Sequence, residues 1–205
     1  MKANHEPQVH DLLAALPPVT EAQLRTLHDA LADRSDAQGM LDVAYRTLDT
    51  PVGTLLLAAT EQGLVRVAYA TEGHDQVLAA LAARVSPRIL NAPRRLETAV
   101  REIDEYFGRR RRSFDLPLDL RLSTGFRRTV LSHLPEIGYG HTASYAAIAA
   151  AAGSPRAVRA VGTACATNPL PVVVPCHRVV RSDGSPGRYA GGPAAKLTLL
   201  ELEAA

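Results

Sequence analysis

The feature that most constrains the fold of this chain is a change in its hydrophobic pattern near residue 120. Before that point, short apolar runs such as Thr54–Ala58 and Leu64–Tyr69 are separated by turn residues, which is typical of β-strands. The connection between these two runs ends in Gly63, where a positive φ suits a hairpin. From residue 121 onward, apolar residues recur every three or four positions, as in helices. The sequence therefore predicts a small α/β domain over residues 41–120 and a mainly α domain over residues 121–205.

Within the first part, helices are expected over residues 73–84 and 94–107. Residues 114–120 alternate apolar and polar side chains apart from Pro117, so an edge strand is expected there. Residues 1–40 are expected to form a helical extension with one or two helices over residues 8–35. The apolar positions behind that expectation are Leu12, Leu13 and Leu16 before Pro17, and Leu24, Leu27 and Leu31 after the cap residue Thr20.

Composition excludes several classes of protein. No apolar run approaches the roughly 20 residues that span a bilayer, so no membrane partner is expected. The two cysteines, Cys165 and Cys176, form neither a disulfide framework nor a metal-ligand spacing, which favours the reducing cytoplasm and no metal. From Arg121 onward, nine Lys and Arg stand against four Asp and Glu. This excess favours a polyanion partner, although a modest basic face is also common on solvated surfaces.

A helix-turn-helix is the layout predicted for residues 144–168. An alanine-rich helix is stopped by a glycine, and Ser154 and Pro155 are expected to begin a second helix. Arg156 and Arg159 would lie in the first turns of that helix, which suits contact with nucleic acid. An ordinary αα-hairpin fits the same pattern equally well.

The strongest chemical signal is the hexapeptide Pro175-Cys176-His177-Arg178-Val179-Val180. Positive charge beside a thiol lowers its pKa from roughly 8.5, so His177 and Arg178 predict a reactive Cys176. A core cysteine at the end of a strand is the plainer alternative, because free cysteine is among the most buried residue types. Cys165, within the second helix of the pair, is expected only to pack.

Taken together, these segments resemble the O6-alkylguanine-DNA alkyltransferases (methylated-DNA–protein-cysteine methyltransferases) over residues 42–203. The segments that carry the resemblance are, in order, Ser144-Tyr145, Arg159-Ala160-Val161-Gly162, Asn168-Pro169, Pro175–Val180 and Arg188-Tyr189-Ala190-Gly191-Gly192. The resemblance implies that the α/β domain holds a small sheet with helices and that the C-terminal domain is of winged-helix type. It also implies irreversible, single-turnover repair, in which the alkyl group on O6 of guanine, or on O4 of thymine, passes to the protein.

The resemblance further implies a role for each site residue. Cys176 would accept the alkyl group, and His177 would take the thiol proton through a bound water. Glu203 would orient the imidazole, which meets the general need for a base held by a third group. Tyr145 would press on the target phosphate and protonate the leaving guanine, while Asn168 would brace the turn before the cysteine. No cofactor is implied.

For DNA, the resemblance implies a double-stranded partner containing O6-alkylguanine, bound by a monomer. Arg159 would fill the space left by the extruded base, and small residues such as Gly162 would let the helix approach the minor groove. The implied DNA-binding residues are Arg159, Tyr145, Arg156, Gly162, Arg127 and Arg128. The implied base pocket consists of Tyr189, Ala190 and Gly191, although Ala190 stands where some members carry a hydroxyl that can contact O6.

Two other functions fit parts of the sequence. A cysteine hydrolase could use Cys176 with His177, although consecutive residues on an extended chain point to opposite faces. A DNA-lesion sensor could keep the helix-turn-helix without the transfer, although such relatives replace the cysteine that is present here. The run Arg109–Arg112 is expected to be a solvated loop, with a nucleic-acid contact as the alternative.

Overall fold

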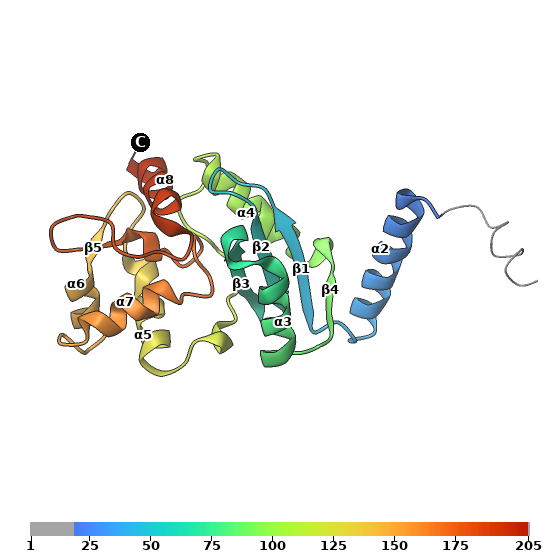
Figure 1. The fold of residues 1–205 in the computed structure, drawn as a ribbon, viewed down its shortest axis with the longest axis horizontal. Helices are drawn as coiled ribbons and strands as arrows, with labels where there is room; N and C mark the ends of the chain where they lie inside the picture. The colour runs from blue at the N-terminus through green and yellow to red at the C-terminus, as the bar shows by residue number, and fades with distance from the viewer. Residues whose placement is uncertain (1–18, 205) are drawn as a thin grey trace, which may run out of the picture.

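The computed structural model describes residues 19–204, in which a four-stranded sheet and a group of helices lie side by side (Figure 1). The strands are β1 (Val43–Leu48), β2 (Leu55–Thr60), β3 (Gly63–Tyr69), β4 (Ile89–Asn91), β5 (Ala143–Ser144) and β6 (Val179–Val180). The α-helices are α2 (Glu21–Ala37), α3 (His74–Arg84), α4 (Glu97–Phe107), α5 (Gly125–His133), α6 (Tyr145–Ala151), α7 (Val158–Ala166) and α8 (Gly192–Ala204). Short 3-10 turns are η1 (Ala70–Glu72), η2 (Pro93–Leu96), η3 (Leu120–Leu122), η4 (Leu134–Glu136) and η5 (Cys176–Arg178).

The sheet has the strand order β3-β2-β1-β4, and only the β1–β4 pair is parallel. The predicted hairpin is confirmed as β2–β3. Gly63 begins β3 with a φ of +133°, and a Cβ there would lie 2.1 Å from the carbonyl oxygen of Pro117. Both the backbone angle and this close approach therefore require glycine at the turn. Strand β4 has only three residues and was not predicted.

Helices cover both faces of the sheet, so all six residues of β2 are buried. On one face, Leu56 packs in a cluster with Leu81 of α3. On the other face, Leu57 belongs to a cluster that includes Ile103 of α4 and continues as far as Leu199 of α8. One apolar core therefore joins the sheet to the C-terminal helices.

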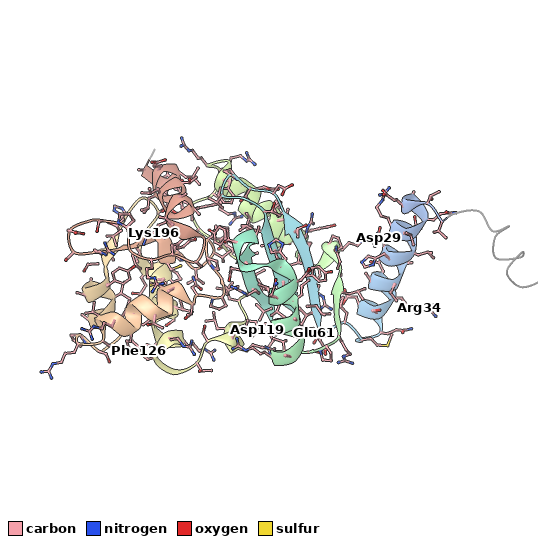
Figure 2. The ribbon with its side chains drawn as sticks, in the orientation of Figure 1. Asp29, Arg34, Glu61, Asp119, Phe126 and Lys196 are labelled. Carbon is pink, nitrogen blue, oxygen red and sulfur yellow. The ribbon has the colours of Figure 1, made fainter. Side chains whose placement is uncertain are left out.

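Residues 114–120 do not form the predicted strand. The segment makes one isolated bridge, in which Leu118 pairs with Leu64 at the edge of the sheet. Pro117 has no N–H to extend the ladder. The Asp119 amide donates to the Leu64 carbonyl at 2.9 Å, and its side chain accepts from the Thr60 hydroxyl at 2.6 Å. Asp119 lies at the junction between the sheet and the helical part (Figure 2).

The helical part confirms most of the predicted helix-turn-helix. The side chain of Ser144 accepts a hydrogen bond from the Ala147 amide and caps α6. Helix α7 begins at Val158, not at Pro155 as predicted, because residues 154–157 form a separate turn in which the Ala157 amide bonds to the Ser154 carbonyl. Helices α5, α6 and α7 pack together, and β5 pairs in parallel with β6. The loop over residues 181–188, called the wing, follows β6 and precedes α8.

The N-terminal extension contains α2, which begins after the predicted cap Thr20; Thr20 and Gln23 also form a capping box. Helix α2 lies beside β4, where His28 bonds to the carbonyl of Asn91 at 2.7 Å (Figure 1). The leucines predicted as its apolar stripe remain more than half exposed: Leu24, Leu27 and Leu31. The preceding leucines, Leu12, Leu13 and Leu16, lie outside the described residues. No helix among residues 19–204 is both long and apolar enough to cross a bilayer.

Candidate functional site

The chain reaches Cys176 through tight turns. After α7 ends, residues 168–174 are buried and contain no strand, so the cysteine does not stand at a strand end. Val172 has a φ of +73°. A β-branched residue rarely adopts this angle, and such outliers cluster at functional sites. The turn is therefore held by its surroundings.

Asn168 holds this turn against the cysteine. Its Nδ2 donates to the carbonyl of Val174 at 2.9 Å and to Sγ of Cys176 at 3.1 Å. Its Oδ1 accepts from the amide of Leu170 at 2.9 Å. The side chain is 2% exposed. Asn168 thus links the thiol to the turn that precedes it.

The thiol is not activated in the way that its sequence neighbours suggested. Cys176 is completely buried, and burial raises its pKa to about 11, against a lowering contribution from the Asn168 hydrogen bond. His177 and Arg178 direct their side chains toward Glu203, so their charge does not act on the sulfur as predicted. The prediction of a lowered pKa was therefore wrong. The thiol is protonated near neutral pH and needs a base during reaction.

Glu203 accepts hydrogen bonds from four residues on three segments: α4, the turn at residue 140 and η5. Its Oε1 accepts from Tyr106 Oη at 2.7 Å, Arg178 Nη2 at 2.8 Å and His177 Nε2 at 2.9 Å. Its Oε2 accepts from Arg178 Nε at 2.9 Å and from the amide of Gly140 at 3.2 Å. Burial favours the neutral acid, but the hydrogen bonds from His177, Arg178 and Tyr106 lower the pKa of Glu203 to about 2. Glu203 is therefore an anchored anion, although it lies near the end of the chain.

His177 is held in one tautomer. A carboxylate can only accept, so Nε2 carries the proton that bonds to Glu203, and Nδ1 is the free base. Nδ1 is buried, and no atom of residues 19–204 hydrogen-bonds to it. Burial lowers the pKa of His177 despite the Glu203 contact. The imidazole is therefore neutral at pH 7, and the lone pair on Nδ1 is not engaged by another group of residues 19–204.

The predicted base-pocket residues follow the wing. Tyr189 is 8% exposed, its ring lies 6.2 Å from that of His177, and its hydroxyl lies 2.9 Å from the hydroxyl of Tyr69 in β3. Gly191 is required here because a Cβ would lie within 2.7 Å of the Tyr69 ring. The sheet domain therefore forms part of the wall that holds these residues.

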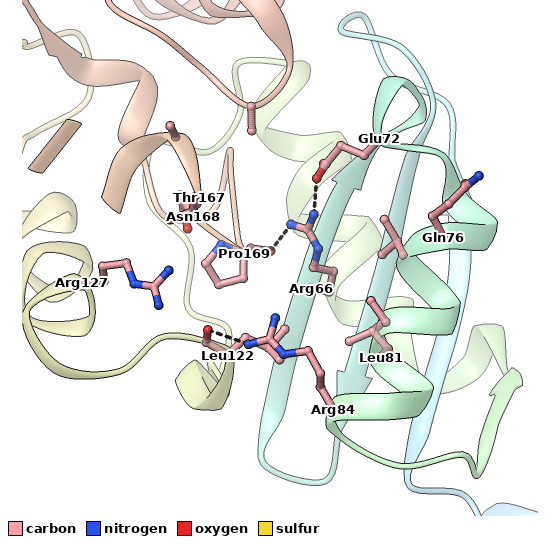
Figure 3. Close-up of a pocket in the computed structure, with 14 residues that line it drawn as sticks. Arg66, Glu72, Gln76, Leu81, Arg84, Leu122, Arg127, Thr167, Asn168 and Pro169 are labelled. Carbon is pink, nitrogen blue, oxygen red and sulfur yellow. Dashed lines mark hydrogen bonds and ion pairs between the residues drawn. The ribbon is translucent and has the colours of Figure 1, made fainter. Parts of the chain in front are cut away.

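A cavity of about 490 Å³ separates α3 from the turn that carries Asn168 (Figure 3). Ala190 is the one predicted pocket residue on its wall, and Cys176 does not reach it. Arg66 of β3 enters this cavity, pairs with Glu72 and donates to the carbonyl of Pro169 at 3.1 Å. The Val67 amide donates to the same carbonyl at 2.8 Å. The sheet thus fixes the peptide that follows Asn168.

The predicted DNA-binding arginines lie on the outer helices and the turn between them. Arg127 and Arg128 on α5, Arg156 in the turn and Arg159 on α7 are all exposed. Within residues 19–204, none of the four forms an ion pair with a carboxylate. A Cβ added at Gly162 would meet nothing within 4 Å, so the backbone of α7 is open to close approach. The surface suits a polyanion.

Tyr145 begins α6, as predicted, and is half-buried. Burial raises the pKa of its phenol. Its hydroxyl occupies space that only a glycine at position 187 leaves free, because a Cβ there would lie 2.0 Å away. Lys196 of α8 lies 6.0 Å from the Tyr145 ring centroid. Lys196 is completely buried and donates to the Val179 carbonyl at 2.6 Å.

Two further expectations concern residues away from the thiol. Cys165 is 1% exposed within α7, so it packs as predicted. The Arg109–Arg112 run is not simply solvated: Arg111 pairs with Glu102, Glu105 and Asp115, and Arg112 lies 5.6 Å from the Tyr139 ring centroid.

Sequence reasoning missed the residues that reach the site from the sheet domain. Tyr106 and Arg66 are 97 and 103 residues from their partners Glu203 and Pro169. The apolar stripe of α4 could have indicated Tyr106, since it follows Ile103 by three positions and carries a hydroxyl that needs a partner when buried. No local pattern indicates Arg66 or the buried Lys196.

A buried thiol held by Asn168, on a helical domain whose exposed arginines lack ion-pair partners among residues 19–204, suits the class of nucleic-acid-binding proteins that use a cysteine. The model for the DNA-binding domain of 6-O-methylguanine DNA methyltransferase matches residues 125–205, and the model for the ribonuclease-like domain of the same protein matches residues 43–120. The chain belongs to this family of methylated-DNA–protein-cysteine methyltransferases.

Individual relatives agree with the family assignment. The chain is 38% identical over 161 residues to a methylated-DNA–protein-cysteine methyltransferase of Mycolicibacterium paratuberculosis, covering 78% of this chain and 92% of that one. It is 39% identical over 166 residues to the bifunctional transcriptional activator/DNA repair enzyme Ada of Escherichia coli, covering 80% of this chain but only 46% of Ada. The solved Mycobacterium tuberculosis OGT in complex with DNA is 37% identical with a TM-score of 0.69, covering 78% of this chain and 92% of that one.

Proposed function

We propose that this chain repairs duplex DNA by moving an alkyl group from O6 of guanine, and from O4 of thymine, irreversibly to Sγ of Cys176. The observation that carries the proposal is the arrangement at the thiol. Asn168 donates to Sγ at 3.1 Å, and the adjacent imidazole has its Nδ1 free and its Nε2 fixed on Glu203. A protonated nucleophile beside an oriented neutral base suits a single displacement.

The transfer forms one sulfur–carbon bond, breaks one carbon–oxygen bond and moves two protons. The thiol proton passes through a water to Nδ1 of His177, and the sulfur lone pair attacks the alkyl carbon. The carbon–oxygen bond breaks, and its electron pair stays on the guanine, which takes a proton from Tyr145. The thioether cannot be hydrolysed by this site, so each chain acts once. The pKa of about 11 at Cys176 explains why a base is needed.

DNA binding in this proposal uses the exposed arginines. Arg127, Arg128 and Arg156 contact phosphates, which gives sequence-tolerant and salt-sensitive affinity. The target base must leave the stack to present its O6 substituent to a buried thiol, at a cost of a few kcal/mol. Arg159 then fills its place, and the base enters beside Tyr189, Ala190 and Gly191. The DNA complex of the M. tuberculosis relative supports a DNA partner.

The acting unit is a monomer with an extension over residues 1–40, a sheet domain over residues 41–120 and an acceptor domain over residues 121–205. Its location in the cytoplasm stays a prediction from the cysteine content. A cysteine hydrolase is disfavoured because the hydrogen bond to Sγ comes from Asn168, whereas the Nε2 of His177 is engaged by Glu203. A lesion sensor without transfer would not need this relay.

The direct test is incubation with duplex DNA that contains O6-methylguanine, followed by intact mass measurement and peptide mapping. One methyl group per chain should appear on Cys176, and Cys176→Ala should abolish transfer while retaining DNA binding. Cys165→Ala is the matched control, because it removes the other buried thiol of the chain and should leave the transfer in place. Repaired DNA recovered together with unmodified Cys176 would refute the proposal.

A further inference from the structure

We propose that Tyr106, on α4 of the sheet domain, is a positioning residue that sets the proton affinity of His177 through Glu203. This inference rests on the proposed function for its kinetic consequence, although its chemical core is a property of the folded protein. Residue 106 falls within the ribonuclease-like family match, whereas His177 and Glu203 fall within the DNA-binding match. The sheet domain would then contribute directly to the relay.

The geometry places the tyrosine hydroxyl at the carboxylate oxygen that the imidazole uses. Tyr106 Oη donates to Glu203 Oε1 at 2.7 Å and lies 3.5 Å from His177 Nε2, which itself bonds to the same Oε1. The tyrosine is completely buried, with its ring 5.3 Å from those of Phe107 and Phe114 and 6.1 Å from that of Tyr139. The hydroxyl therefore has a fixed direction and no access to bulk water.

Tyr106 and His177 bond to the same carboxylate oxygen of Glu203, so the Tyr106 hydrogen bond affects the proton affinity of His177. A carboxylate stabilises a neighbouring imidazolium in proportion to the negative charge left on the contacted oxygen. A short hydrogen bond from a phenol removes part of that charge, so Tyr106 weakens the pull of Glu203 on a second proton at His177. The imidazole then remains neutral, which is the form that accepts the thiol proton.

Other groups face His177, and none duplicates this effect. They are Arg178 on its own turn, Glu203 and Lys196 on α8, and Tyr189 before α8. Arg178 and Lys196 lower the pKa of His177 by charge, and Glu203 raises it. Tyr106 alone among these neighbours hydrogen-bonds to the Oε1 of Glu203 as an uncharged donor.

The test is an NMR titration of the His177 imidazole in the full chain, with no DNA present. Tyr106→Phe keeps the ring and removes the donor, so the His177 pKa should rise by about 0.5 to 1 unit. The acid limb of Cys176 alkylation by free O6-benzylguanine should move to higher pH by the same amount. Tyr139→Phe is the matched control, since its hydroxyl donates to the Leu202 carbonyl at 3.1 Å on the same helix as Glu203.

A second substitution tests the direction of the expected shift in the His177 pKa. Incorporating 3,5-difluorotyrosine at position 106 makes the phenol a stronger donor, so the His177 pKa should fall. A purely structural role would not produce shifts of opposite direction. An unchanged titration in both variants, or an equal shift in Tyr139→Phe, would overturn the inference. If Tyr106→Phe fails to fold, the fluorinated chain decides alone. Absence of any alkylation in the unmodified chain would refute the proposed function and leave the titration result standing.

Discussion

Acid should weaken this protein specifically through Glu203. The carboxyl has a pKa of about 2 in the folded chain against an ordinary value of 4.5. This difference corresponds to about 3 kcal/mol of folding free energy, because one pKa unit is worth about 1.4 kcal/mol. A depressed carboxyl pKa contributes this stability fully above pH 4.5 and loses it as the pH falls toward 2. Between pH 6 and pH 3, the free energy of unfolding should therefore fall by about 2 kcal/mol.

Glu203→Gln removes the titrating group and leaves the guanidinium of Arg178 buried without its anion. Its unfolding free energy at pH 6 should be about 3 to 5 kcal/mol lower than that of the unmodified chain. Urea denaturation at several pH values should show this gap narrowing by about 2 kcal/mol as the pH falls to 3. Glu201→Gln, an exposed site on the same helix, is the control and should give a pH-independent offset near zero. A gap for Glu203→Gln that stays constant from pH 6 to pH 3 would contradict the reasoning.

Three further predictions concern substitutions of arginine residues. Arg159→Ala should slow repair of duplex DNA far more than reaction with free O6-benzylguanine, and equal losses would argue against a role in base extrusion. Arg127→Gln combined with Arg128→Gln should weaken binding to any duplex and reduce the salt slope by about 2, measured by titration at several salt concentrations. Arg66→Met should lower the unfolding free energy by about 1 to 3 kcal/mol and slow the free-base reaction, because the Pro169 carbonyl and the half-buried Glu72 carboxylate lose a donor. Unchanged urea midpoints would count against a stabilising role of Arg66.

Much of the local structure could be predicted because its signals lie within a few residues. The β2–β3 hairpin follows from Gly63, the start of α6 from Ser144, and the start of α2 from Thr20. The errors have local causes as well. Residues 154–157 close a turn of their own before α7, although Pro155 suits a first helical position. Residues 114–120 have the alternation of a strand but pair with the sheet at a single bridge.

The site was predicted only in part, because the contacts that were missed join residues far apart in the sequence. Asn168 and Cys176 are eight residues apart, so their contact belongs to one turn. Glu203 was placed at His177 by family resemblance, since the two are 26 residues apart. The pKa of Cys176 was predicted in the wrong direction, because the residues next to it in sequence were expected to place their positive charges near its sulfur. His177 and Arg178 in fact direct their donors away from the sulfur.

The two matched family regions meet in a single functional arrangement, because the acceptor domain does not complete its own site. The carbonyl of Pro169 is held by β3, the hydroxyl of Tyr189 meets that of Tyr69, and the carboxylate of Glu203 accepts from Tyr106. Each contact joins a buried polar group to a donor or hydroxyl partner on the sheet domain, and a buried group left unpaired costs about 1 to 3 kcal/mol. Separation of the two domains would therefore unpair the turn, the base pocket and the relay together. The sheet domain therefore supports the Asn168–Cys176 turn and the Glu203–His177 pair from outside, through Pro169 and Tyr106.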